Sequence, residues 1–348
     1  MDIKLKDIAR MAGVSESTVS LALNNKSVVN EKTRLHIQEL AHELGYSPNA
    51  IAKALARKKS GTMGLVVPDI ENPFYGKLVR IVDELLNLRH YNLIVATSNE
   101  RVSGERRVIE NFISERVEGV MIAPINKTVK DFEHLSKLAK NQIRHVFVTA
   151  YYPDYPSSHV MTDLEQGTFD LVDYLIEQGH RQIRFLIGDQ GTVPVLARMQ
   201  GYVKAHGKHG LKVDKSRFVH CSLPNFEQAY RAALSLFKSQ RQTDAVITMN
   251  DVMALGVLRA VTECGIRIPE QMSLAGYDNV IYSSIATIPI TTVEQDVETM
   301  AVAAVDMLLG MTPEDWNNHR TLLLPPKLIV RESTGRKWHD ADKQGTGG

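Results

Sequence analysis

Residues 5–25 read LKDIARMAGVSESTVSLALNN, and this stretch decides how the start of the chain folds. Apolar residues at positions 5, 8, 9 and 12 follow the i, i+3, i+4, i+7 spacing of one helix face. Gly13 supplies a tight turn, and Ser15 is a typical N-cap for a second helix over about 16–24. Two short helices joined by such a turn form the helix-turn-helix layout, in which the second helix lies in the DNA major groove.

A third short helix follows directly. Asn30 is its predicted N-cap, we expect Leu35, Leu40 and Leu44 to point inward, and Gly45 occupies the C-terminal stop position. Three helices of this length bury only a small apolar core. Such a core is sufficient for a DNA-binding head and insufficient for a catalytic domain.

The stretch YSPNAIAKALARKKSGT, residues 46–62, separates the head from the rest of the chain. Pro48 cannot continue the third helix, and Asn49 can cap a new helix over about 49–57. A helix this short is not stable alone in water. We therefore expect it to order on a partner surface, as a hinge helix, with Ser60 and Gly61 forming a flexible joint.

Charge is distributed unevenly along the chain. The 348 residues carry a net charge of +1, with 41 Lys or Arg and 40 Asp or Glu, but residues 1–60 hold ten of the former and six of the latter. The head is therefore net positive and the remainder slightly negative, which favours a polyanion as the partner of the head alone.

The sequence contains no recognisable cofactor, metal or membrane motif. Cys221 and Cys264 match no CxxC spacing, and His206 and His209 lie in an expected loop, so we expect no metal site and no cofactor. No run of 18 apolar residues exists, and the N-terminus has no apolar signal core. These features predict a cytoplasmic protein that contacts no membrane.

From residue 62 onward, short apolar runs alternate with helical stretches such as 77–88, 105–115, 168–178 and 252–263. This alternation predicts an α/β fold with parallel sheets that are covered on both faces. The strands are too many for one compact sheet, so two lobes are expected. The predicted strands are 64–68, 92–98, 119–124, 145–149, 159–162, 183–188, 218–222, 245–249, 273–277 and 291–293.

The complete head, together with TRLHIQELAHELGYSPNAIAKALA at residues 33–56, resembles the LacI/GalR (lactose-repressor/galactose-repressor) family of transcriptional regulators. The resemblance extends to about residue 334 and implies a two-lobed, periplasmic-binding-protein-like body. It implies that the chain crosses between lobes near 161–164, 288–293 and 322–326. The expected domains are a head with its hinge helix at 1–60, a body at 61–334 and a disordered tail at 335–348. Within the body, the N-lobe comprises about 61–161 and 291–323, and the C-lobe about 162–290 and 324–334.

The same resemblance assigns DNA contacts. Glu16, Ser17 and Leu21 match base-reading positions, and Leu21 differs from many relatives because it can touch only a thymine methyl group where Arg would bind guanine. Glu16 either accepts a hydrogen bond from cytosine or faces water. Leu55 matches a wedge that opens a base step in the minor groove, the alternative being packing within a linker helix. The full set is Leu5, Ser15, Glu16, Ser17, Thr18, Ser20, Leu21, Asn24, Thr33, Asn49, Ala52 and Leu55.

Polar and aromatic residues that follow the predicted strands form a candidate effector site. Ligands of open α/β folds bind beyond the carboxyl ends of the strands. Aromatic planes, paired donors and paired acceptors suit a carbohydrate or a heterocycle. Phe74 and Tyr75 either stack on the ligand or pack inside the lobe, and Phe226 is either a stacking residue or core. The candidates are Phe74, Tyr75, Arg198, Phe226, Asn250, Asp278 and Gln295. The resemblance to the LacI/GalR family implies their role as effector contacts, and Arg198 matches a ligand position of that family.

One position departs from the family pattern. Ala150 stands where many relatives carry an Asp that binds ligand hydroxyls, which puts an ordinary monosaccharide ligand in doubt. A similar Ala occurs in the catabolite-control branch, so a regulator that responds to a phosphorylated carrier protein is the alternative. A solute-binding protein, the alternative of another class, would lack the basic head and would carry a signal peptide.

Enzyme functions find no support in the sequence. GDQG at 188–191 lacks the Gly-Lys-Ser/Thr ending of a phosphate loop, and neither HExxH nor GxSxG is present. The tail has no leucine heptads that would build a tetramer. We therefore predict a homodimeric, allosteric repressor that binds a palindromic operator in double-stranded DNA and is controlled by a small-molecule effector.

Overall fold

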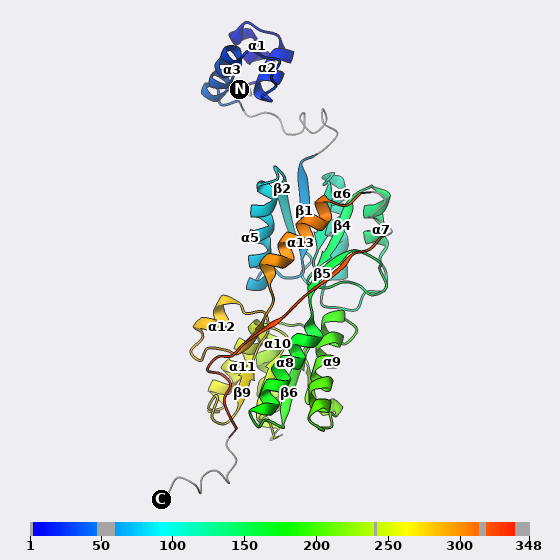
Figure 1. Ribbon diagram of the computed structural model, residues 1–348, viewed down its shortest axis with the longest axis vertical. Coiled ribbons are helices and arrows are strands. Elements are labelled where there is room, and N and C mark those ends of the chain that lie inside the picture. Colours follow the sequence, from blue (N-terminus) through cyan, green and yellow to red (C-terminus); the bar gives the residue numbers. More distant parts are fainter. Residues whose placement is uncertain (1–2, 47–59, 240–241, 313–317, 338–348) are drawn as a thin grey trace, which may run out of the picture. The chain divides into compact units, whose positions relative to one another are not determined.

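The computed structural model describes residues 3–46, 60–239, 242–312 and 318–337. The chain forms two compact units, Met1–Ser60 and Gly61–Gly348, which are considered separately below (Figure 1). Asn49, Ala52 and Leu55, and with them the expected hinge helix, lie outside the described residues. Within the described part, no helix is both long and apolar enough to span a membrane.

The first unit contains three helices, α1 (Leu5–Ala12), α2 (Glu16–Leu23) and α3 (Glu31–Glu43). Gly13 ends α1 with φ +65°, a left-handed conformation that glycine adopts without steric cost. Ser15 accepts a hydrogen bond from the backbone N–H of Thr18, and Asn30 accepts one from that of Lys32. Both predicted N-caps are therefore confirmed.

The core of this head is built from small and β-branched residues. Ile8, Val19 and Ile37 are completely buried, and the alanines of α2 and α3 pack beside them. The prediction that Leu35 points inward is wrong, since its side chain is 51% exposed. Ile37, two residues further along α3, points into the core instead, because residues i and i+2 of a helix lie on nearly opposite faces.

The body contains two parallel sheets. The N-lobe sheet has the order β11-β5-β4-β3-β1-β2 and the C-lobe sheet the order β7-β6-β8-β9. All ten predicted strands are present; β11 and β12 occupy a stretch that was expected only as a crossing. The bounds are β1 Thr62–Val67, β2 Asn92–Thr97, β3 Gly119–Ile122, β4 Arg144–Val148, β5 His159–Thr162, β6 Ile183–Ile187, β7 Phe218–His220, β8 Ala245–Thr248, β9 Ser273–Ala275, β10 Thr292–Glu294, β11 Thr321–Leu324 and β12 Lys327–Ile329.

Helices cover both faces of the N-lobe sheet. Met63, Leu65 and Val67 of β1 pack against α5 and α13, which lie on the same side of the sheet, whereas Val66 faces the opposite core with α6 and α7 (Figure 1). Alternate residues of one strand thus serve two cores. These helices are α5 Pro73–Asn87, α6 Val102–Ser114, α7 Glu133–Lys140 and α13 Val297–Leu309, and the C-lobe carries α8 Leu164–Glu177, α9 Val193–Lys208, the 3₁₀ turn η1 Lys215–Arg217, α10 Phe226–Lys238, α11 Asp251–Glu263 and α12 Ile281–Ile285.

Three chain passages join the two lobes. One runs from β5 into α8, one from β10 into α13, and one from β11 into β12. The second and third passages are themselves paired, because β10 and β12 form a two-stranded antiparallel sheet. A short ladder therefore holds the second and third passages together.

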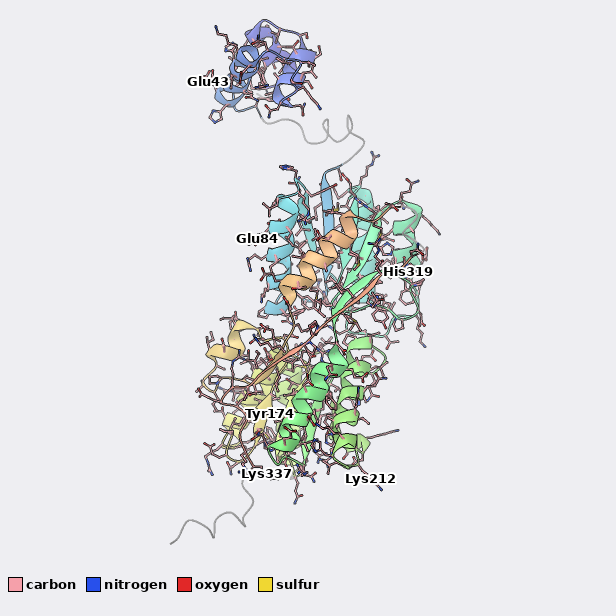
Figure 2. The ribbon with its side chains drawn as sticks, in the orientation of Figure 1. Glu43, Glu84, Tyr174, Lys212, His319 and Lys337 are labelled. Carbon is pink, nitrogen blue, oxygen red and sulfur yellow. The ribbon has the colours of Figure 1, made fainter. Side chains whose placement is uncertain are left out.

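The C-terminal end of the described chain packs on the C-lobe. The backbone N–H of Gly335 donates to Ser273, and Lys337, labelled in Figure 2, donates to Asp244 across 2.6 Å. The expected tail boundary at residue 335 therefore falls inside this contact, which extends the body to Lys337. A buried, hydrogen-bonded carboxylate explains why the chain is held there.

The packing of α9 on α8 depends on a glycine. A Cβ atom at Gly201 would lie 2.1 Å from the carbonyl oxygen of Glu165, so α8 and α9 approach each other more closely than any side chain allows. Gly207, on the same helix, has no atom within 4 Å of its Cβ position. Both glycines lie in the same helix, but only Gly201 is in close contact with another helix.

Gly201→Ala should destabilise the body by about 1–3 kcal/mol, because the added methyl group forces two helices apart. Gly207→Ala should leave the stability unchanged or raise it by about 0.5–1 kcal/mol, since alanine favours helix. Urea unfolding followed by circular dichroism measures both. Equal midpoints for the two variants would contradict the assigned close packing.

Candidate functional site

A cleft between the lobes gathers most of the predicted effector residues. Phe74, Tyr75, Arg198, Asn250, Asp278 and Gln295 line one pocket together with Ala150. The sequence analysis did not identify the other lining residues, which are Asp69, Asn72, Glu100, Pro124, Asn126, Thr149, Leu164, Pro194, Pro224 and Met249.

The topology explains why these residues meet. The two parallel sheets direct the carboxyl ends of their strands toward the same cleft, and the lining residues follow β1, β2, β3 and β4 in one lobe and β8 and β9 in the other. The rule that predicted Asn250 and Asp278 therefore also applied to Glu100 and Asn126, which follow β2 and β3. Those two residues were missed because the rule was not applied to every strand.

Arg198 lies on α9 and is almost fully buried. Its guanidinium carbon stands 4.2 Å from the centre of the Tyr277 ring, and one terminal nitrogen donates to the carbonyl of Pro194. Stacking on the aromatic face fixes the orientation of the cation. The Nε atom is buried and has no protein partner within hydrogen-bond distance, which leaves a donor for a bound molecule.

Asp278 and Gln295 form a buried pair at the second passage. Gln295 Nε2 donates to Asp278 Oδ1 across 2.7 Å, and Gln295 Oε1 has no hydrogen-bond partner. Burial, reinforced by the nearby charge of Asp251, raises the pKa of Asp278 to about 8. A ligand that donates a hydrogen bond or brings a positive charge to Asp278 therefore favours its ionised form.

Asp251 is the second carboxylate of this region, and sequence reasoning passed over it in favour of its neighbour Asn250. It is completely buried, accepts hydrogen bonds from Thr292 Oγ1 and from the backbone N–H of Val280, and has its pKa raised to about 7 by burial. It therefore holds the passage strand β10 against the start of α11.

Asn250 does not offer the free donor and acceptor that were expected. Its Oδ1 caps α11 by accepting from the backbone N–H of Met253, and its Nδ2 donates to the carbonyl of Pro224. These bonds leave one amide hydrogen for a ligand. The residue mainly fixes the shape of the C-lobe wall.

Phe74 and Tyr75 serve as core and as lining at once. Asn72 caps α5 by accepting from the backbone N–H of Phe74, and the two rings meet edge to face at 5.3 Å. Both side chains belong to the N-lobe core, and both border the cleft. Burial, with the charges of Glu100 and Asp278, raises the pKa of the Tyr75 phenol.

Phe226 is not a member of the cleft lining. It begins α10, its side chain is 40% exposed, and its ring stacks near that of Tyr230. Residue 226 lies on the helix that follows the loop, and the loop itself supplies Pro224 to the cleft.

A pair of hydrogen bonds joins the lobes at the edge of the cleft. Asp189 of the C-lobe accepts from both the backbone N–H and the hydroxyl of Thr128 in the N-lobe, at 3.0 and 3.1 Å. A Cβ atom at Gly191 would clash with the Thr128 hydroxyl. The GDQG stretch therefore connects the lobes rather than cradling a phosphate.

The head presents a separate polar surface on α2. Glu16, Ser17 and Leu21 are exposed, and the hydroxyls of Ser15, Ser17 and Thr18 form a chain of hydrogen bonds at the N-terminus of the helix. Asn24 donates to the carbonyl of Ser20 and ends the helix. Of the remaining predicted contacts, Leu5 and Thr33 are partly buried.

A helix-turn-helix head joined to a two-lobed body with a polar cleft defines a ligand-responsive DNA-binding transcriptional regulator. Residues 4–49 match bacterial regulatory proteins of the lacI family, and residues 172–334 match the periplasmic binding protein-like domain. The HTH-type transcriptional regulator GalR of Escherichia coli is 30% identical, with 98% of each chain covered. The chain belongs to the LacI family.

Other relatives agree with this membership. Catabolite control protein A of Priestia megaterium is 29% identical over 96% of this chain and 100% of its own. The Lac repressor dimer bound to operator and an anti-inducer superposes with a TM-score of 0.83 at 26% identity, covering 96% of this chain and all of that one. A transcriptional regulator CelR–cellobiose complex matches with a TM-score of 0.68 at 28% identity, covering 95% and 99%.

Asp278→Asn should make the body more stable than the wild type as the pH rises from about 5 to about 8. An acid whose folded pKa exceeds the usual value near 3.9 destabilises the fold as the pH rises through that interval, because the unfolded chain releases the proton first. The wild type should lose on the order of 1 kcal/mol per pH unit in this window, a loss that the amide avoids. Thermal unfolding across the pH range measures it, with exposed Asp154→Asn as control, and parallel curves for wild type and Asp278→Asn would contradict the assignment.

Proposed function

We propose that this regulator is a repressor that binds a palindromic operator as a homodimer. Its affinity for DNA is set by a small molecule, a carbohydrate or a related metabolite, held in the cleft between the lobes. It acts by binding rather than by catalysis, and it works in the cytoplasm. The observation that carries the proposal is the combination, in one chain, of an exposed α2 face with a polar cleft lined by residues from both lobes.

The head supports sequence-specific binding. Leu21 is 39% exposed on α2, where an apolar side chain meets a thymine methyl group in the major groove. The hydroxyls of Ser15, Ser17 and Thr18 surround the N-terminus of the same helix, an arrangement that suits a DNA phosphate. The operator should therefore differ from those of relatives that place Arg at position 21.

The cleft supports effector control. Asp278 accepts a hydrogen bond from Gln295, and Asp251 accepts one from Thr292. These bonds attach the C-lobe wall to the second passage between the lobes. A ligand that forms a hydrogen bond with Asp278 alters the bond between Asp278 and Gln295 and, with it, the angle between the lobes. Coupling between such sites typically amounts to about 1–3 kcal/mol. CelR, a relative with cellobiose in its structure, is consistent with a carbohydrate effector.

The body supports a dimer. The residues Ile281, Tyr282 and Ile285 on the short helix α12 are 62%, 50% and 67% exposed. Three large apolar residues together on a surface helix indicate a buried interface in the assembly. A second copy of the chain is the occupant that a palindromic site requires, and the Lac repressor is a dimer in its operator complex.

Selection of random double-stranded DNA by the full-length protein tests the function. The expected result is an enriched sequence with two inverted half-sites. Repeating the selection in the presence of metabolite pools, or of a phosphorylated carrier protein, shows which kind of signal alters binding. Recovery of DNA without any shared sequence would overturn the proposal, and a response to the carrier protein alone would favour catabolite control, the alternative that Ala150 suggests.

Leu55→Ala should lower operator affinity at least tenfold, equivalent to about 1.4 kcal/mol, while leaving effector binding intact, because the wedge acts only on DNA. Leu35→Ala, which alters an exposed leucine of the head, is the matched control. Fluorescence anisotropy with the selected operator measures both variants. Equal losses in DNA and effector binding, or no loss at all, would count against the wedge.

Ile285→Lys should shift the protein from dimer to monomer at micromolar concentration, because it places an uncompensated charge in the interface. Val203→Lys, on an exposed face of α9, introduces the same charge elsewhere and should leave the dimer unchanged. Sedimentation velocity distinguishes the two. An unchanged sedimentation coefficient for Ile285→Lys would place the interface on another face.

A further inference from the structure

The charges of the cleft are unbalanced. Three carboxylates, those of Asp69, Glu100 and Asp278, face a single cation, Arg198, and no Lys or His belongs to the described lining. Carboxylates accept hydrogen bonds and donate none when ionised. In their ionised form these groups offer more acceptors than the single cation of the lining can satisfy, and a bound molecule can supply the missing donors.

Glu100 is held in the N-lobe wall by specific bonds. Its two carboxylate oxygens accept from the backbone N–H and the side-chain amide of Asn126, at 2.7 and 2.6 Å, and only 9% of the residue is exposed. Each oxygen can accept a further bond. Burial raises the pKa of this carboxyl and Asp69 adds to the shift, whereas the Asn126 bonds and the charge of Lys127 oppose it.

Asp278 occupies the C-lobe wall of the same cleft. One of its oxygens is bonded to Gln295, and no protein donor lies within hydrogen-bond distance of the other. The charges of Glu100 and Asp278 both act on the buried Tyr75 phenol. The two carboxylates, one from each lobe, line the same pocket.

The backbone is strained at both carboxylates. Glu100 has φ +55° and Asp278 has φ +105°, and Thr149 beside Ala150 has φ +73°. The left-handed residues His90, Arg116 and Gln142 each follow the end of a helix, where this conformation is common, whereas these three follow strands and line the cleft. Strain of this kind persists where the surrounding structure fixes a side chain for a function.

We propose that Glu100 is the N-lobe acceptor of the cleft, and that the effector is a neutral or cationic polyhydroxyl molecule whose donors bridge Glu100 and Asp278. Donors from such a molecule favour the ionised form of both acids, whereas a phosphate or carboxylate group would add negative charge and further acceptors to a lining with three acids and one cation and should bind less well. This inference rests on the proposed function, because it assumes that the cleft is the effector site.

The test compares matched ligands on the full-length protein. Thermal shifts are measured for sets that contain a neutral sugar, its amino sugar and its phosphate, at equal ionic strength. In every set that gives a response, the neutral or the amino sugar should raise the melting temperature and the phosphate should not. A phosphate that binds as well as its parent sugar, or no response to any neutral or amino sugar, would overturn the proposal.

Variants then locate the acceptor. Glu100→Gln should weaken the binding of the responding sugar at least tenfold, whereas Glu115→Gln, at an exposed position in the same lobe, should not change it. Adding Ala150→Asp to Glu100→Gln should restore part of the affinity, because it supplies a carboxylate to the same pocket. Unchanged affinity in Glu100→Gln, or loss without any restoration, would remove Glu100 from the role.

Two controls separate this inference from its premises. Melting of each variant without ligand shows whether it folds, and Glu100→Gln should gain stability over the wild type as the pH rises above about 4.3, where an unfolded Glu ionises. The absence of that gain would contradict the raised pKa of the buried Glu100 carboxyl. Operator binding by the same preparations reports on the proposed function independently, so a failure of ligand chemistry alone leaves the DNA-binding function standing.

Discussion

The body depends on one buried carboxylate, that of Asp251. One oxygen accepts from the hydroxyl of Thr292 in the passage strand, the other accepts from the backbone N–H of Val280, and the backbone N–H of Asp251 donates to the carbonyl of Tyr277. Gly276 is required beside it, since a Cβ atom there would lie 2.1 Å from the carboxylate. A buried acid is costly unless every lone pair finds a donor, so this group fixes three segments at once.

The consequence is a cleft whose walls are set by hydrogen bonds rather than by apolar packing alone. Asp278, only a few residues from the segment that Asp251 holds, is presented to the cleft and bonded to Gln295. Across the cleft, Asn126 presents Glu100, and beside them Thr128 and Asp189 join the lobes. A molecule entering the cleft therefore competes directly with the bonds that set the relative position of the lobes.

The head is stabilised differently from the body. Its core is small, and its stability relies on caps and on tight turns such as those at Ser15, Asn30 and Gly13. Its polar groups gather on α2 instead of being buried, which suits a surface that exchanges water for DNA. A chain of the LacI family contains both arrangements. DNA recognition requires polar groups exposed on the head, and ligand binding requires polar groups buried in the cleft.

Local chemistry alone determined a large part of this protein. Caps, apolar periodicity and strand ends predicted the three head helices and ten strands of the body, because these features depend on neighbours in sequence. Strand ends together with the resemblance to the LacI/GalR family predicted six residues of the cleft. The tertiary structure decided what depends on distant segments. It pairs β11 with β5 across some 160 residues, turns Leu35 and Phe226 outward, and brings Glu100, Asn126 and Asp251 to the sites they occupy. Those outcomes follow from which surfaces pack together and which buried acceptors find donors, and neither is encoded in any short stretch of sequence.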